Sequence, residues 1–231
     1  LYYRKIWIGV NKMREKYDEK LKLLNDNLVK MGEMVKEQIA NTIRIIETQN
    51  KEIAKEILQN ENDINSMEKN IERLCLNLIL HEQPVAKDLR TISSAFKMII
   101  DLERIGDHAT DISEIILETK KTLKNIENFK NFIAMSNKTT EMITNSINAY
   151  INKDINLANL VIKSDDELDD LFEKIKKEMM HLIKDTDEDG EKIIEDLLIA
   201  KYFERIGDHS VNIAEWAIFS ITGEHKNSKI L

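Results

Sequence analysis

The hexapeptide ERIGDH occurs twice in this chain of 231 residues, at Glu103–His108 and at Glu204–His209. The stretches that surround the two copies, LERIGDHATDISEI and FERIGDHSVNIAEW, share eight identities, six of them consecutive. A match of this length, offset by 101 residues, indicates an internal duplication. The chain is therefore expected to contain two copies of one structural unit.

Apolar residues around each copy recur at spacings of three and four, which lines one face of an α-helix. In the first copy these positions are Leu102, Ile105, Ala109, Ile112 and Ile116. The whole chain has one proline and six glycines, whereas sheet proteins need many more turn residues. We therefore predict an all-α fold with almost no strand.

The same periodicity predicts three helices in each half. They run from Tyr17 through Ile39, about Lys51 to Leu80 with a kink at the polar run NENDIN, about Val85 to Lys121, Phe132 through Ile147, about Lys153 to Ile183, and about Lys192 to Thr222. Pro84 is expected in the first turn of the third helix, where a missing N–H costs nothing. The stretch KKTLKNIENFKN would connect the halves, and DTDEDGE would break the pattern before the last helix.

INSME at Ile64–Glu68 resembles LDDLF at Leu168–Phe172. Their offset of 104 residues is close to the 101-residue offset of the hexapeptides. These observations predict two tandem, pseudo-symmetric three-helix bundles. The first bundle is placed at residues 13–122 and the second at 123–223, followed by a polar C-terminal tail at 224–231. Residues 1–12, LYYRKIWIGVNK, are aromatic and basic and are interpreted as a candidate leader or non-native segment.

Composition and motifs exclude several classes of function. The net charge of −8 argues against nonspecific nucleic-acid binding, which needs a basic face. Cys75 is the only cysteine, so the chain has no internal disulfide and no thiolate metal cage. The apolar piece IWIGV is too short to span a bilayer, so a membrane is expected to be met only through a partner. Without a P-loop, a dinucleotide motif or a nucleophile beside a base, an enzyme is not predicted.

Carboxylates form a row on the predicted third helix. Glu103 and Asp107 are separated by four residues, so they share a face, where two like charges destabilise a helix by a few tenths of a kcal/mol. Asp111 extends this row by one turn. The second half repeats the row with Glu204, Asp208 and Asn212. An acidic row kept twice predicts a cation site, and oxygen donors favour Mg²⁺, Mn²⁺ or Fe²⁺.

Asp88, fifteen residues before Glu103, is a further candidate ligand. The competing interpretation is a solvated face with local ion pairs, such as Arg104 to Asp101 or to Asp107. His108 and its counterpart are turned about 140° from the glutamates, since each residue rotates the helix by about 100°, and they are expected to pack or hydrogen-bond at the bundle edge.

Gly106 and Gly207 lie inside helices, where glycine costs up to about 1 kcal/mol relative to alanine. A cost kept in both halves suggests close approach to the backbone. A neighbouring helix is the expected cause, and a bound cluster is the alternative.

The duplicated ERIGDH with its trailing Asp or Asn, the PVAKDLR segment at Pro84–Arg90 and the double three-helix layout resemble the PhoU family of bacterial phosphate-signalling proteins. The resemblance covers residues from Met13 to about Gly223. It implies a cytoplasmic negative regulator of phosphate uptake, peripheral at the inner face of the membrane. The implied partners are a phosphate ABC transporter component and a sensor histidine kinase. It also implies metal ions or multinuclear metal clusters at E-x-x-x-D pairs, which match Glu103 with Asp107 and Glu204 with Asp208.

The sequence also allows other hypotheses for the function. The second half reads DEDGEKIIEDL and has no counterpart of PVAKDLR, so the two sites need not be equivalent. Related domains also occur with sodium/phosphate cotransporters and potassium-transport regulators. A metal-independent helical adaptor is therefore the main alternative, and a metal-dependent phosphatase is a remote one. A homodimer is expected only on the general ground that amphipathic bundles often pair.

Overall fold

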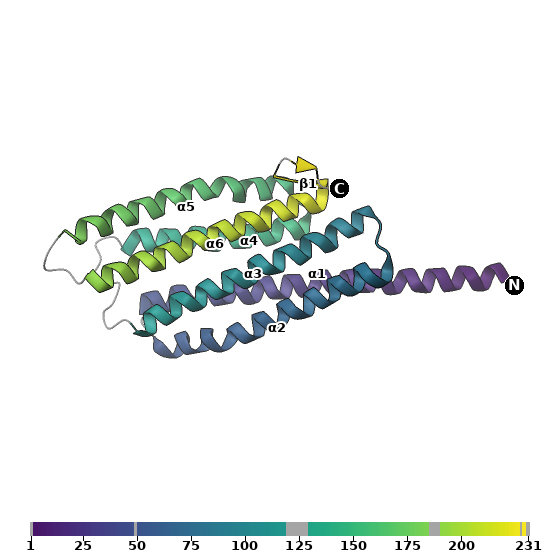
Figure 1. The fold of residues 1–231 in the computed structure, drawn as a ribbon, viewed down its shortest axis with the longest axis horizontal. Helices are drawn as coiled ribbons and strands as arrows, with labels where there is room; N and C mark the ends of the chain where they lie inside the picture. Colours follow the sequence, from purple (N-terminus) through teal and green to yellow (C-terminus); the bar gives the residue numbers. More distant parts are fainter. Residues whose placement is uncertain (1, 49, 119–128, 185–189, 227, 230–231) are drawn as a thin grey trace.

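The structure is a computed structural model that describes residues 2–48, 50–118, 129–184, 190–226 and 228–229, with side chains at 14–48, 50–118, 130–184 and 190–226. These residues form six long helices and one short antiparallel hairpin (Figure 1). The helices are α1 (Tyr2–Thr48), α2 (Lys51–Glu82), α3 (Ala86–Glu118), α4 (Phe129–Asn152), α5 (Ile155–Leu182) and α6 (Gly190–Thr222), and the strands are β1 (Glu224–His225) and β2 (Ser228–Lys229). The all-α prediction is confirmed.

The limits of α2 to α6 lie close to those predicted from the periodicity, whereas α1 extends beyond the predicted Tyr17–Ile39 at both ends. Helix α2 continues unbroken through residues 60–65, where a kink was expected, because Ile57, Ile64 and Ile71 stay buried at intervals of seven. Pro84 precedes α3 instead of lying in its first turn, since the helical hydrogen bonds begin with Leu89 N–H donating to Val85 O. Most of the predicted connection between the halves, and most of the predicted break before α6, lie outside the described residues.

Side-chain caps mark the first turns of α2 and α5. Asn50 caps α2 by accepting a hydrogen bond from the Glu52 N–H, and Asp154 caps α5 by accepting from Asn156 N–H and Leu157 N–H. Such side-chain acceptors satisfy N–H groups that have no partner within the helix. These caps fix where α2 and α5 begin, shortly after the ends of α1 and α4.

Helices α1, α2 and α3 pack together, as do α4, α5 and α6 (Figure 1). The two bundles are not separate bodies, because α3 packs along α6 in the most extensive interface of the described chain and α1 contacts α4. One continuous apolar core runs through both halves, with Phe132 and Phe203 among its largest fully buried side chains. Two tandem bundles are confirmed, and they share a core.

Helices α3 and α6 run antiparallel along each other (Figure 1). In the first half of α3 the Lys97 ammonium lies 6.0 Å from the centre of the Trp216 ring, in the second half of α6, and in the second half of α3 His108 lies beside Tyr202, in the first half of α6. Because equivalent residues are 101 apart, these contacts relate the halves by an approximate twofold axis near Gly106 and Gly207. The two hexapeptides therefore meet at the centre of the molecule.

Both end segments that the sequence set apart from the bundles have regular structure where they are described. Residues 2–12, the candidate leader, continue α1 as helix, and this end projects beyond the other helices (Figure 1). After α6, residues 224–226 of the predicted polar tail fold back, and the His225 ring stacks on Trp216 at 3.9 Å between centroids. None of the described helices combines the length and the apolar character that crossing a membrane requires.

Candidate functional site

The first carboxylate pair lies on α3 and faces α2. The side chains of Glu103 and Asp107 are only 19% and 28% exposed. Burial raises the pKa of Glu103, the nearby Asp107 raises it further, and Glu68 and Glu61 of α2 add to the effect. Four carboxylates from two helices therefore oppose one another at this point, and the two on α2 were not foreseen.

Positive charge only partly offsets this first cluster. Arg104 Nη1 donates to Asp107 Oδ2 at 3.0 Å, and Arg104 Nε lies 3.7 Å from Glu103 Oε2. The predicted ion pair between Arg104 and Asp107 is confirmed. On α2, Asn65 lies one turn from Glu61 on the same face. Its Oδ1 atom is buried and accepts no hydrogen bond within the described part of the chain, which leaves that oxygen without a donor.

The second carboxylate pair lies on α6 and faces α5. Burial, followed by Asp169, Asp208 and Glu204, raises the pKa of Asp165 to about 6. Burial and then Glu204 raise the pKa of both Asp169 and Asp208. The Lys201 ammonium is ion-paired with Glu204. The second cluster therefore also has four acidic side chains, and the pKa is raised at three of them.

The two clusters correspond at most positions, although the counterpart of Glu68 is Phe172 and the counterpart of Asp169 is the amide Asn65. The offset of 104 places Glu61 opposite Asp165 and Asn65 opposite Asp169, while the hexapeptide offset aligns the pairs on α3 and α6. The second-helix members could have been found in the sequence, because the INSME and LDDLF segments overlap this acidic face. An i,i+4 pattern on both facing helices was the available signal.

Glycine lets the facing helices approach at both clusters. A Cβ atom at Gly207 would overlap Cδ2 of Leu168, and one at Gly106 would lie 3.3 Å from Cδ1 of Ile64. Leu168 and Ile64 occupy equivalent positions in the two halves and are both buried. Helix packing, which was the expected reason for the two glycines, is confirmed, and it brings the acidic faces together.

Three other candidate ligands lie elsewhere. Asp88 accepts a hydrogen bond from the Tyr17 hydroxyl of α1 at 3.1 Å. Asp111 Oδ2 lies 3.3 Å from His108 Nδ1, at the interface of α3 and α6. Asn212 Nδ2 donates to Asp101 Oδ1 at 3.1 Å, at the same interface. Each step of four residues rotates the side-chain direction by about 40° around the helix axis. The third member of each row, Asp111 or Asn212, is therefore turned by about 80° from the glutamate that begins the row.

The two hexapeptide histidines meet between the bundles. The rings of His108 and His209 lie 5.6 Å apart, and Tyr202 lies 5.4 Å from His108. Burial lowers the pKa of His108, although a hydrogen bond with Asp111 acts in the opposite direction. The histidines pack and hydrogen-bond as predicted, but the contact between the halves replaces the expected bundle edge.

The donor set suits a hard divalent cation. Among the side chains that the structure describes, no three of His, Cys, Asp or Glu are gathered in a ready metal-binding group. The two carboxylate clusters nevertheless offer oxygen donors only, and the pKa values of Glu103 and Asp165 are raised first by burial and then by the neighbouring carboxylates, whose repulsion a cation would relieve. The uncoordinated Asn65 oxygen points to the same kind of ligand.

The chain is similar in sequence to proteins of one known family. The family model of the PhoU domain matches residues 28–116 and 132–217, one match in each half. The phosphate-specific transport system accessory protein PhoU homolog of Clostridium acetobutylicum is 34% identical, over 91% of this chain and 96% of that protein. The PhoU of Escherichia coli is 27% identical, over 90% of this chain and 86% of that protein.

Solved structures agree with this comparison. The crystal structure of PhoU from Pseudomonas aeruginosa superposes with a TM-score of 0.85 at 26% identity, covering 90% of this chain and all of that one. The phosphate transport system regulatory protein PhoU from Streptococcus pneumoniae gives 0.84 at 26% identity, over 90% and 98% of the two chains. With a domain match in each half, a relative above 30% identity along nearly its whole length, and the duplicated bundle, this chain belongs to the PhoU family.

Proposed function

We propose that this chain is an accessory regulator of a phosphate-specific transport system. The observation that supports it best is the pair of PhoU-domain matches, together with full-length relatives that are named as accessory proteins of such systems. In this proposal the protein acts in the cytoplasm as a negative regulator. It contacts a phosphate ABC transporter component at the membrane face and a sensor histidine kinase, without catalysing a reaction itself.

Deletion of the gene tests the regulatory role. In phosphate-rich medium a phosphate-starvation reporter should rise in the deletion strain and return to its basal level when the wild-type gene is restored. Repression that persists unchanged in the deletion strain contradicts the proposal. Co-purification of the transporter's ATP-binding subunit, or of the kinase, with the tagged protein would separate the two proposed contacts.

We further propose that each acidic cluster binds divalent metal, Mg²⁺, Mn²⁺ or Fe²⁺, as single ions or as a multinuclear group. The residues that would hold metal are Glu61, Asn65, Glu103 and Asp107 in the first half, and Asp165, Asp169, Glu204 and Asp208 in the second. The repeated opposition of acidic faces on equivalent helices supports this. A bound cation would supply the positive charge that Arg104 and Lys201 provide only in part.

Elemental analysis of the purified protein tests the metal sites. The variants Glu103→Gln/Asp107→Asn and Glu204→Gln/Asp208→Asn should each lose a share of the bound metal. A matched control is Glu33→Gln/Glu37→Gln, an exposed i,i+4 pair on α1, which should leave the metal content unchanged. Wild-type protein without stoichiometric metal, after growth and purification without chelators, contradicts the metal sites.

The second candidate is a metal-independent adaptor whose acidic faces contact a basic partner. The ion pairs of Arg104 with Asp107 and of Lys201 with Glu204 favour it, because they already neutralise part of each row. Metal-free protein that still restores repression would select this candidate. If wild-type protein depleted of metal fails to restore repression and recovers it when metal is added back, the adaptor is excluded, because its acidic faces are intact in both states.

A further inference from the structure

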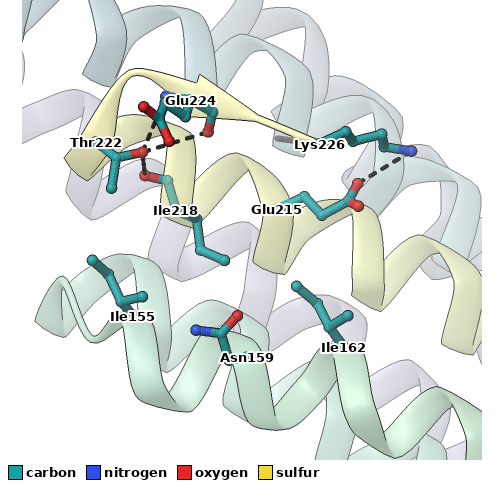
Figure 2. Close-up of a pocket in the computed structure, with 8 residues that line it drawn as sticks. All are labelled: Ile155, Asn159, Ile162, Glu215, Ile218, Thr222, Glu224 and Lys226. Atoms are coloured by element: carbon teal, nitrogen blue, oxygen red, sulfur yellow. Dashed lines mark hydrogen bonds and ion pairs between the residues drawn. The ribbon is translucent and has the colours of Figure 1, made fainter. Parts of the chain in front are cut away.

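A cavity of about 310 Å³ lies between the first turns of α5 and the last turns of α6 (Figure 2), and its lining residue Ile162 precedes Asp165 of the second carboxylate cluster by about one helical turn. The segment that follows α6 folds over it, and Glu224 and Lys226 of that segment line its rim. This volume is at the lower end of the range for small-molecule sites. The function proposed above does not use this cavity.

One wall of the cavity is hydrocarbon. Ile155 and Ile162 lie two turns apart on one face of α5, and Ile218 of α6 faces them (Figure 2). Contact with these side chains would remove the apolar part of a small ligand from water, at about 25 cal/mol per Å² buried. The wall therefore favours an aliphatic group of a few carbons.

The polar side of the cavity contains a carboxylate with an unused oxygen. Glu215 is 18% exposed, and its Oε2 atom is buried and accepts no hydrogen bond from the described residues. Lys226 Nζ lies 3.2 Å from that oxygen, outside hydrogen-bond geometry, and His225 Nε2 lies 3.8 Å from it. The Lys226 side chain is 59% exposed, so its ammonium can move into water at little cost.

The charges around the cavity favour a cation. Glu215 and Glu224 bring two negative charges, and the C-terminal end of α6 at Thr222 adds the negative end of the helix dipole. Lys226 is the one fully charged cation among the lining residues described. Burial lowers the pKa of the neighbouring His225, so near neutral pH this ring adds no second positive charge. A phosphate would face two carboxylates, which argues against an anionic ligand.

We propose that this cavity binds a small aliphatic primary ammonium ion, such as an alkylamine or a short diamine. Its ammonium group donates a hydrogen bond to Oε2 of Glu215, and its carbon chain lies on Ile155, Ile162 and Ile218. Binding displaces the Lys226 ammonium from Glu215. Because His225 stacks on Trp216 beside Lys226, displacement also changes the surroundings of the Trp216 ring.

Titration with n-butylammonium chloride, followed by calorimetry and by Trp216 fluorescence in a Trp7→Phe background, tests the proposal. Saturable binding is expected, whereas n-butanol, with the same chain and no charge, should bind at least tenfold more weakly. Glu215→Gln should weaken n-butylammonium binding about tenfold or more, the cost of losing a hydrogen bond to a charged group. The matched control Glu114→Gln changes the equivalent exposed residue of α3 and should bind as the wild type does.

A second variant tests the proposal independently of whether Glu215→Gln folds correctly. Lys226→Ala removes the cation that competes for Glu215 and should bind n-butylammonium more tightly than the wild type. Weaker binding by Lys226→Ala, equal binding by Glu215→Gln in a folded protein, or a linear response without saturation overturns the proposal. Each of these readouts is independent of metal content and of phosphate-dependent repression, so a failure here is distinguishable from failure of the proposed function.

Discussion

The Nδ1 atom of His209 lies 2.8 Å from Oδ1 of Asp101, and this contact joins the two halves of the chain. Asn212 donates to the same oxygen at 3.1 Å. Across the approximate twofold axis, the residue equivalent to Asp101 is Tyr202, which lies against His108. The hexapeptide histidines therefore hold the bundles together, with a different partner in each half.

Replacing Asp101 should weaken the interface between the halves. Asp101→Ala leaves His209 and Asn212 without their acceptor in a half-buried site, and about 1–3 kcal/mol of unfolding free energy is expected to be lost. Urea denaturation followed by circular dichroism measures this. Asp26→Ala, at an exposed position of α1, should change stability by less than about 0.5 kcal/mol. Equal effects at the two positions would contradict the role of Asp101.

Alanine should be tolerated differently at the two equivalent glycines. At Gly106 the new Cβ meets Ile64 at 3.3 Å, and the gain of up to about 1 kcal/mol in helix propensity offsets this crowding. At Gly207 the Cβ would overlap the buried Leu168, so Gly207→Ala should cost about 1–2 kcal/mol. Thermal unfolding compares the two variants, and adding Leu168→Val to Gly207→Ala should recover part of the loss. The opposite ranking of the two alanine variants would refute the packing argument.

Asp165 should make the protein less stable at neutral pH than at mildly acidic pH, in the absence of divalent metal. Its pKa in the folded protein is about 6, against an ordinary value of 3.8, so the folded state binds the proton more tightly than the unfolded state. The penalty is fully relieved below the unfolded pKa and is present above the folded pKa. Asp165→Asn is therefore expected to raise stability at pH 7.5 by about 1 kcal/mol, allowing for solvent screening.

This gain should shrink as the pH falls below 6 and disappear only below the unfolded pKa of 3.8, as urea denaturation at several pH values would show. The exposed neighbour Asp170, changed to Asn, serves as control and should have little effect at any of these pH values. With MnCl₂ added, the proposed metal site predicts that wild type gains more stability than Asp165→Asn. A constant gain across the pH range would exclude charge repulsion as its cause.

Cys75 should be unreactive in the native protein. It is fully buried, and burial raises the pKa of its thiol to about 12, so the reactive thiolate is scarce at neutral pH. Ellman's reagent is expected to react only as fast as the bundle opens, and therefore faster as urea is added. A Cys75→Ala/Leu80→Cys variant places the thiol at a position that is 70% exposed and should react quickly. Prompt stoichiometric reaction of native wild type is the result that would be incompatible with this burial.

Much of the architecture could be predicted because its causes are local. The spacing of Leu102, Ile105 and Ala109 defines a helix face without reference to any other segment. The duplication then required a second bundle, and the family resemblance agrees with the comparisons. The pairing of Glu103 with Asp107 followed from four-residue spacing alone, because one turn of helix puts them on one side.

The partners of these residues could not be predicted in the same way. Glu61 lies 42 residues and Glu68 lies 35 residues before Glu103, and only the packing of α2 on α3 brings them to it. Asp111 belongs to the same spacing pattern, yet the gradual rotation of the helix turns it toward α6.

The sequence by itself determined six amphipathic helices, two equivalent halves and the carboxylate pairs, because each depends on spacing within one helix. Only the tertiary structure decided which faces meet: α2 and α5 opposite the carboxylates, and Asp101 opposite His209 across the molecule. Helix periodicity leaves the partner of each face open. That choice is made when apolar stripes from distant segments exclude water together, and the polar residues beside the stripes are then brought into contact.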